Sequence, residues 1–148
     1  MKKIAALFLF GVSPAFFAAD STLVSGAAIT PAEAIEKATA SADGASGVFE
    51  MVVRNVEAES GGFVLYSESD PRDRRCLAVY LFPSALKEML KESGLEPAVN
   101  FQGKKIRVRG ATDTTKRAIT DDAKNKFGAY YQRVFVPVFH AKNLVVVR

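Results

Sequence analysis

Cationic and aromatic side chains gather near the C-terminal end of the chain, in a pattern that suits an anionic polymer. The set comprises Lys116, Arg117, Lys124, Lys126, Tyr130, Tyr131 and Arg133. Lysine and arginine neutralise phosphate, sulfate or carboxylate groups, and flat rings stack on bases or sugars. Tyr66 and Tyr80 lie opposite the main apolar face of their predicted strands and extend this surface. The pattern predicts binding of single-stranded nucleic acid or an acidic polysaccharide.

The same segment also fits a purely structural interpretation. A long connection needs anchors, and Phe127, Tyr130 and Tyr131 would hold it against the body while the lysines are solvated. The protein would then be an envelope module that docks another protein and has no polymer ligand. Salt-sensitive retention on heparin or single-stranded DNA separates the two interpretations, because polymer binding depends on the release of counterions.

Catalytic and metal chemistry have little support among the residue types. His140 is the only histidine and Cys76 the only cysteine, so neither a nucleophile–histidine–acid set nor a zinc site is expected. Glu68, Asp70 and Asp73 are spaced closely enough to gather a hard cation, but neighbouring arginines offer internal pairing instead. We therefore expect a non-enzymatic protein with no metal and no cofactor. Cys76 is expected to be a buried thiol.

The charge of the chain is divided unevenly along its length. The formal net charge is +4. Residues 20–100 carry seven Lys/Arg and thirteen Asp/Glu, a net charge of −6, whereas residues 101–148 carry eleven and three, a net charge of +8. Such asymmetry indicates either an anionic partner for the basic part or pairing between the two parts.

Pairing is favoured for one group of cations. Lys105, Arg107 and Arg109 lie on the outer face of one predicted strand, next to the strand that carries the acids. Their expected partners are Glu50, Glu57 and Glu59.

The first nineteen residues predict an export signal. Lys2 and Lys3 precede an uncharged apolar run from Ile4 to Ala19, which is shorter than the roughly 20 residues of a membrane span. We expect residues 1–19 to be removed, with no membrane span afterwards, and the mature protein to be periplasmic or extracellular. An uncleaved interfacial anchor is the alternative, because the cleavage site is imperfect.

Residues 20–46 are expected to form a tether with one short helix. Thr30 is a suitable N-cap, Pro31 suits the first turn, and Glu33 completes a capping box. The helix should fray before Gly44.

Alternating apolar residues predict five strands in the remainder. They cover residues 48–58, 63–67, 76–82, 104–111, and a last strand of 131–138 and 143–147 that is interrupted at His140. A helix is predicted from Pro83 to Ser93, with Leu86, Met89 and Leu90 at helical spacing, and Ile106 and Val108 should face inward. Residues 112–129 show no periodicity and are predicted to be a long loop.

This order of elements predicts a mainly β domain over residues 47–148, a five-stranded Greek-key barrel with a helix between its third and fourth strands. Three stretches carry a resemblance as well: the strand and acidic loop of 63–73, the Gly-Lys-Lys-Ile-Arg-Val strand of 101–110, and the hydrophobic run of 141–147. Through them, residues 30–148 resemble small secreted bacterial proteins of the oligonucleotide/oligosaccharide-binding (OB) fold. The chain departs from that pattern at Tyr66, where Asn is usual, and in its longer connection after Gly110.

Overall fold

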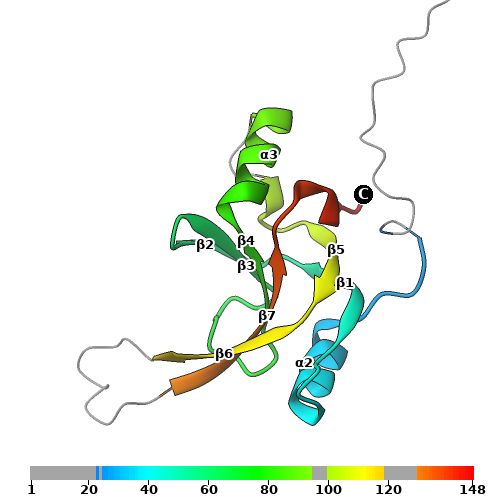
Figure 1. The fold of residues 1–148 in the computed structure, drawn as a ribbon, viewed down its shortest axis with the longest axis vertical. Coiled ribbons are helices and arrows are strands. Elements are labelled where there is room, and N and C mark those ends of the chain that lie inside the picture. Colours follow the sequence, from blue (N-terminus) through cyan, green and yellow to red (C-terminus); the bar gives the residue numbers. More distant parts are fainter. Residues whose placement is uncertain (1–22, 24, 95–99, 119–129) are drawn as a thin grey trace, which may run out of the picture.

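The described part of the protein is mainly β, with strands in two sheets and two helices of fully described extent (Figure 1). A computed structural model describes residues 23, 25–94, 100–118 and 130–148. The helices are α2 (Pro31–Ala40) and α3 (Pro83–Ser93). The strands are β1 (Ser46–Val52), β2 (Asn55–Glu59), β3 (Gly62–Tyr66), β4 (Leu77–Leu81), β5 (Lys105–Ala111), β6 (Asp113–Ala118), β7 (Tyr130–Val138) and β8 (Leu144–Val146).

The strands form two sheets, so the single five-stranded barrel predicted from the sequence is not confirmed. One sheet has the order β1-β5-β8 and the other the order β2-β3-β4-β7-β6. Neighbouring strands are antiparallel except β4 and β7, which are parallel. A parallel pair requires a long crossover, and here the crossover carries α3, β5 and β6.

Two strands of one sheet continue almost directly into strands of the other. β1 is followed within three residues by β2, and only Thr112 separates β5 from β6. At the first junction the Val53 N–H donates to the Lys104 carbonyl over 2.9 Å, and the Arg54 N–H donates to the Tyr66 carbonyl over 2.8 Å. At the second, the Thr112 N–H donates to the Ala45 carbonyl over 2.8 Å. The predicted first strand of 48–58 is therefore two segments, which bend from one sheet into the other.

The main core lies between the inward faces of both sheets and α3. It includes Phe49 and Met51 from β1, Val79 from β4, and Val136 from β7, all almost fully buried. Ile106 and Val108 are 0% and 1% exposed, which confirms the inward face predicted for that strand. Buried residues from six strands (β1, β3, β4, β5, β7 and β8) join this one cluster, so the separate short strands support one another.

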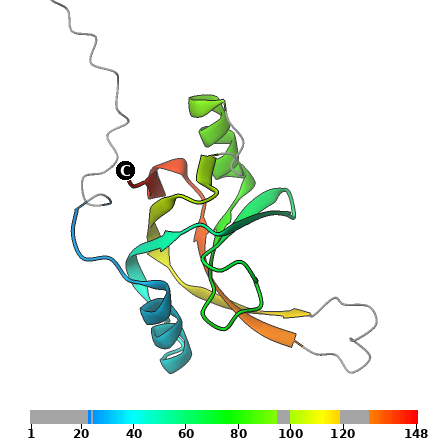
Figure 2. The same ribbon diagram turned by 180° about the vertical axis from the view of Figure 1, so that it is seen from behind.

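The short N-terminal helix is confirmed with its capping box. The Glu33 N–H donates to Thr30 Oγ1 over 3.3 Å, and the Thr30 N–H donates to Glu33 Oε2 over 3.0 Å. The residue before the cap, Ile29, exchanges backbone hydrogen bonds with β1 through Val48 and Glu50. The start of α2 is thus fixed to the edge of the three-stranded sheet (Figure 2).

The predicted helix between the third and fourth strands is also confirmed. α3 ends at Gly94, whose left-handed backbone (φ 67°) suits glycine and whose N–H donates to the Leu90 carbonyl over 2.9 Å. Leu86 and Met89 are buried against the core, as expected, whereas Leu90 is 45% exposed.

The loop predicted for residues 112–129 is partly wrong. β6 pairs with β7 in antiparallel register over residues 113–118. Both figures show this pair extending away from the rest of the five-stranded sheet, on the same side as the β2–β3 hairpin (Figures 1 and 2). Because most β6 side chains face solvent at least partly, the segment lacks the apolar alternation that marks a strand. The rest of the predicted loop, residues 119–129, lies outside the described residues.

Within the described ranges, no helix has the length and apolar character needed to cross a membrane. The predicted export signal of residues 1–19 lies outside them. Cys76 is 8% exposed, and burial raises the pKa of its thiol, which confirms the buried thiol expected from the sequence.

Candidate ligand-binding surface

The candidate site lies on the face of the five-stranded sheet that is turned away from the main core, here called the outer face. Directly paired residues of neighbouring strands share a face. The register therefore places Tyr66, Ala78 and Phe135 in one row of the outer face, and Val64 and Tyr80 in the next. Val64, Tyr66, Cys76 and Ala78 form a second buried cluster there, with Tyr80 and Phe135 packed against it.

A pocket of about 280 Å³ opens on this face, here called the arginine pocket. Its walls come from all five strands of the sheet and from the residues that follow β2 and β4. They are Glu59, Ser60, Val64, Tyr80, Phe82, Thr115, Arg117, Arg133 and Phe135. Two arginines and one carboxylate thus meet aromatic rings in one concave site, which is a common composition for a ligand pocket.

Arg133 is the most deeply buried charge of the pocket. The residue is 9% exposed. Its Nη1 donates to Glu59 Oε2 over 2.9 Å, and its Nη2 donates to the hydroxyl oxygens of Tyr66 over 2.8 Å and Tyr131 over 3.2 Å. Its guanidinium carbon lies 5.4 Å from the centre of the Tyr66 ring, within cation–π range. These contacts fix the arginine in one orientation.

Arg117 pairs with the same carboxylate, that of Glu59. Its side chain is 38% exposed. Burial, followed by the positive charge of Arg133, lowers the pKa of the Arg117 guanidinium, but arginine starts so high that it stays charged at neutral pH. Two guanidinium groups therefore share one carboxylate, which leaves a net positive charge in the pocket.

The two Nε atoms of these arginines find no acceptor in the part of the chain that the structure describes. Among the described residues, Arg117 Nε and Arg133 Nε are the buried side-chain nitrogens or oxygens without a hydrogen-bond partner. A buried donor without an acceptor is costly, and such groups are rare in native proteins. The pocket therefore has unused capacity to donate to an anion.

Aromatic rings continue from the pocket along the surface. The Tyr80 hydroxyl donates to the Glu59 carbonyl over 3.1 Å, and its ring meets Phe82 edge to face at 4.5 Å between centroids. Phe82 in turn stacks on Phe139 at 4.3 Å, with an angle of 28° between the planes. Phe139 is 50% exposed. Tyr80, Phe82 and Phe139 are called the aromatic row below.

The sequence-predicted site residues do not form one surface. In the β6–β7 register, Arg117 opposes Tyr131 and Thr115 opposes Arg133, so these four share the outer face. Side chains alternate along a strand, so Lys116 lies on the opposite face. Tyr130 shares that opposite face and is 63% exposed.

Lys124 and Lys126 lie outside the described residues. Tyr66 is fully buried, so its ring is closed to a ligand, and its role here is to accept a hydrogen bond from Arg133. Burial, more than any neighbouring charge, raises the pKa of the Tyr66 hydroxyl far above its usual value, so it stays neutral. The predicted stacking role of Tyr66 therefore does not fit its placement.

The pairing predicted for the cations of β5 is confirmed for Lys105 and Arg107, and both pair with Glu50. Arg107 Nε donates to Glu50 Oε2 over 2.7 Å, and Lys105 Nζ lies 3.7 Å from Glu50 Oε1. Glu57 instead accepts a hydrogen bond from Asn55, and Glu59 belongs to the arginine pocket.

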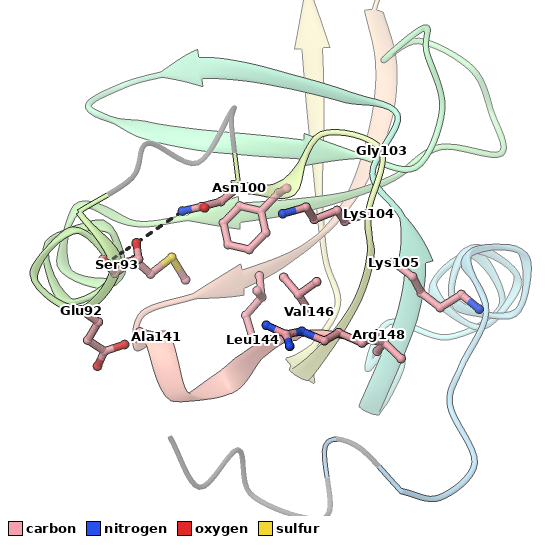
Figure 3. Close-up of a pocket in the computed structure, with 13 residues that line it drawn as sticks. Glu92, Ser93, Asn100, Gly103, Lys104, Lys105, Ala141, Leu144, Val146 and Arg148 are labelled. Carbon is pink, nitrogen blue, oxygen red and sulfur yellow. Dashed lines mark hydrogen bonds between the residues drawn. The ribbon is translucent and has the colours of Figure 1, made fainter. Parts of the chain in front are cut away.

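A second and larger pocket, of about 780 Å³, lies between α3, the start of β5 and β8 (Figure 3). Met89, Phe101, Leu144 and Val146 supply apolar walls. Lys105 points away from it towards α2, as Figure 3 shows. The cations on its rim lack the buried, hydrogen-bonded setting of Arg133, so the arginine pocket is the better candidate.

The acidic loop between β3 and β4 is self-paired, as the sequence predicts. Asp70 pairs with Arg72 at 3.4 Å and Asp73 with Arg75 at 2.9 Å. Hydrogen bonds from Arg75 lower the pKa of the Asp73 carboxyl to about 2. In the described ranges, no three His, Cys, Asp or Glu side chains are grouped as metal ligands would be. His140 follows the end of β7, and its Nδ1 lies 3.2 Å from Oε1 of Glu88 on α3.

Neither a protein-family model nor a curated protein sequence matches this chain. The geometry suits recognition of an anion beside a flat ring. Among the charged and aromatic residues of this surface, Glu59, Phe82, Phe135 and Phe139 were not predicted as site residues from the sequence. The available signal was the run of aromatic residues at the ends of the third and last predicted strands.

Proposed function

We propose that this protein is an exported, non-catalytic binding module of the OB type that holds an anionic polymer on its outer face. The polymer is a single-stranded nucleic acid or an acidic polysaccharide. One observation carries the proposal: Arg117 and Arg133 share a single carboxylate in a pocket that leads into an aromatic row. A polymer that alternates anionic groups with rings has the matching chemistry.

The pairing order of the strands supports the OB assignment. If β1 and β2 count as one bent strand, and likewise β5 with β6 and β7 with β8, five strands result. The first then pairs with the second and fourth, the third pairs in parallel with the fifth, and the fifth pairs with the fourth. We would expect this pairing order of an OB barrel, and the position of α3 between the third and fourth of these strands supports the same proposal.

The position of the pocket supports the binding role. OB barrels usually take ligands across their second and third strands, between the loop that joins strands one and two and the loop that joins strands four and five. The corresponding elements here are β3 and β4, and the loop at Ser60 and Gly61. The arginine pocket has walls from this loop and from both strands. A shared fold does not assign a function, so the proposed binding role depends on the charges and rings of the arginine pocket.

The N-terminal sequence supports the compartment. The basic start and apolar run of residues 1–19 fit a secretory signal. A periplasmic or extracellular protein meets envelope polysaccharides and extracellular DNA, which are both polyanions.

Titration with two polyanions tests the function. The wild-type protein is titrated with oligo-dT and with heparin fragments at low and high salt, beside the variants Arg117→Gln and Arg74→Gln. Arg74→Gln removes the same charge as Arg117→Gln. Because Arg74 is exposed and lies outside the pocket, its variant serves as the control for net charge. We expect Arg117→Gln to weaken binding about tenfold and to make the salt slope about one unit shallower, whereas Arg74→Gln changes little.

Failure of the wild type to bind either polymer at low salt would overturn the proposal. Salt-insensitive co-purification with a single protein would then favour a protein-docking module instead.

A further inference from the structure

Ion pairs of Glu59 join the two edges of the five-stranded sheet on its outer face. β2 and β6 are the two edges of the five-stranded sheet, with β3, β4 and β7 between them. Glu59 is the last residue of β2, yet its carboxylate pairs with Arg117 on β6 and with Arg133 on the neighbouring β7. The pairs of Glu59 with these arginines therefore bridge the surface on which the proposed ligand would lie.

The carboxylate satisfies the two arginines only in part. A guanidinium presents five N–H donors in a planar fork. Glu59 accepts from Arg133 Nη1 at 2.9 and 3.3 Å and pairs with Arg117, but the Nε atoms of both arginines are buried without an acceptor in the described structure. Arg133 is more than nine-tenths buried, so water does not easily replace the missing acceptor. The donors of the pocket thus outnumber the acceptors that Glu59 supplies.

We propose that Arg117 and Arg133 form a subsite for one tetrahedral oxyanion of the ligand, a phosphate or sulfate group. In the ligand-free protein, Glu59 occupies this subsite, and the ligand must displace it. The inference rests on the proposed function for its polymer, but the subsite is defined by the arginines alone. A sulfate ester or a terminal phosphate presents three unesterified oxygens, one more than a carboxylate, and an internal phosphodiester presents two at a wider tetrahedral angle, so such a group can accept from both guanidinium forks.

The local structure allows the carboxylate to leave without unfolding the strand. The Tyr80 hydroxyl holds the backbone carbonyl of Glu59, so the main chain stays fixed while the side chain rotates. The Glu59 side chain is 24% exposed and can swing towards water. It is followed by Ser60 and Gly61, both with left-handed backbone (φ 49° and 79°), where the chain turns from β2 into β3.

Glu59 therefore sets the affinity of the subsite. Removing its charge should strengthen oxyanion binding rather than weaken it, because the ligand no longer competes with an internal anion. If Glu59 instead served only to position the arginines, its removal would weaken binding. The two roles thus predict opposite signs.

The first experiment uses inorganic phosphate as the probe and needs no polymer. Phosphate is titrated against wild type, Glu59→Gln, Glu59→Ala and Glu36→Gln, and binding is read from the rise in melting temperature. Glu36 is exposed on α2, so its variant controls for net charge. We expect Kd for phosphate to fall about tenfold to a hundredfold in both Glu59 variants, the range that one or two charge-assisted hydrogen bonds provide. Adding Arg117→Gln to Glu59→Gln should abolish the gain.

A second measurement needs no variant. In the wild type, the Nε–H resonances of Arg117 and Arg133 should move together as phosphate is added, because these donors acquire an acceptor. The Nε–H of Arg107 already donates to Glu50 and should stay in place. This readout keeps the inference testable even if the Glu59 variants do not fold.

The outcomes separate the subsite from the polymer function. Unchanged or weaker phosphate binding by folded Glu59 variants would overturn the subsite, as would resonances of Arg117 and Arg133 that do not respond. Tighter phosphate binding, with no binding of oligo-dT or heparin by any variant, would support the subsite and overturn the polymer function. Oligo-dT and heparin, titrated against Glu59→Gln, distinguish phosphate from sulfate as the natural group.

Discussion

At the scale of single residues, the charges of the arginine pocket differ in how much they depend on one another. Arg133 has a 10% exposed side chain, four polar contacts and a ring beneath it, whereas the Arg117 side chain is 38% exposed. Removing one partner of a buried ion pair leaves an uncompensated charge, but removing an exposed partner leaves a hydrated one.

Arg133→Ala should therefore cost far more stability than Arg117→Ala. We expect a loss of roughly 3–5 kcal/mol in the free energy of unfolding for Arg133→Ala, since Glu59 and the Tyr66 hydroxyl lose their buried partner. Arg117→Ala should cost about 1 kcal/mol or less, because Arg133 still compensates Glu59. Urea unfolding of both variants provides the measurement. Equal losses would show that the two arginines are not distinguished by burial.

The carboxyl of Asp73 should titrate unusually low, with a midpoint near pH 2, because Arg75 donates to it from both its backbone and its side chain. The folded pKa is lowered, so the stabilisation from this pair is present above the unfolded pKa of about 3.9 and is lost as pH falls towards 2. In Arg75→Gln the midpoint should rise towards the ordinary value. Carbon-detected NMR titration of Asp73 reads both midpoints, and an unchanged midpoint in the variant would rule out the pairing.

At the scale of elements, the helices were the most predictable part because their signals are local. The capping box at Thr30 and the glycine at position 94 lie within the segments that they terminate. β6 was missed because its threonines and cations follow no apolar alternation, and its strand character comes from pairing with β7. Tyr66 was expected to be accessible because a strand usually has one solvent-exposed face. In the fold, distant segments of the chain bury both faces of β3, the strand that carries Tyr66.

The N-cap of α2 should contribute measurably to stability. Thr30→Ala removes the acceptor for the Glu33 N–H and should cost about 0.5–2 kcal/mol in the free energy of unfolding. Thr39→Ala is the matched control, because exposed Thr39 only donates back to the Ile35 carbonyl within the same helix. We expect that control to change stability by less than about 0.5 kcal/mol. Chemical denaturation of the pair would contradict the capping argument if both variants behaved alike.

The candidate site was only half predictable for a related reason. The cations Arg117 and Arg133 were visible in the sequence as a basic, tyrosine-containing segment. The acid that joins them, Glu59, lies 74 positions before Arg133, and only the order of the five-stranded sheet brings the two together. Sequence spacing predicted which chemistry was available, but not which residues would share a pocket.

At the scale of the whole molecule, the acidic and basic parts of the chain pair with each other in the fold. Glu50 engages Lys105 and Arg107, and Glu59 engages Arg117 and Arg133. The net charge of +8 on residues 101–148 therefore overstates the charge that a polymer would meet. Pairing between the two parts, which is one of the two explanations for the uneven charge, is therefore present. Because two arginines share one carboxylate in the arginine pocket, a net positive charge remains there.

The salt dependence of polymer binding should reflect this pairing. Each phosphate neutralised in a single strand contributes about −0.7 to the slope of log K against log salt concentration. Two to four contacts on the outer face would give a slope of about −1.5 to −3 for oligo-dT, well short of the slope of about −6 that eight contacts would give. Titrations across a range of salt concentrations measure it. A slope near −6 would mean that the cations paired with Glu50 also bind the polymer.

The parallel pairing of β4 with β7 also has a consequence for the time course of synthesis. β4 ends at Leu81, but its partner ends at Val138, so the five-stranded sheet cannot be completed until most of the polypeptide has left the ribosome. At about 5–20 residues added per second, the edge of β4 stays bare for several seconds, and such non-local pairing is slow even afterwards. If the leader directs export as proposed, this delay keeps the nascent chain unfolded during the interval in which a translocase must capture it.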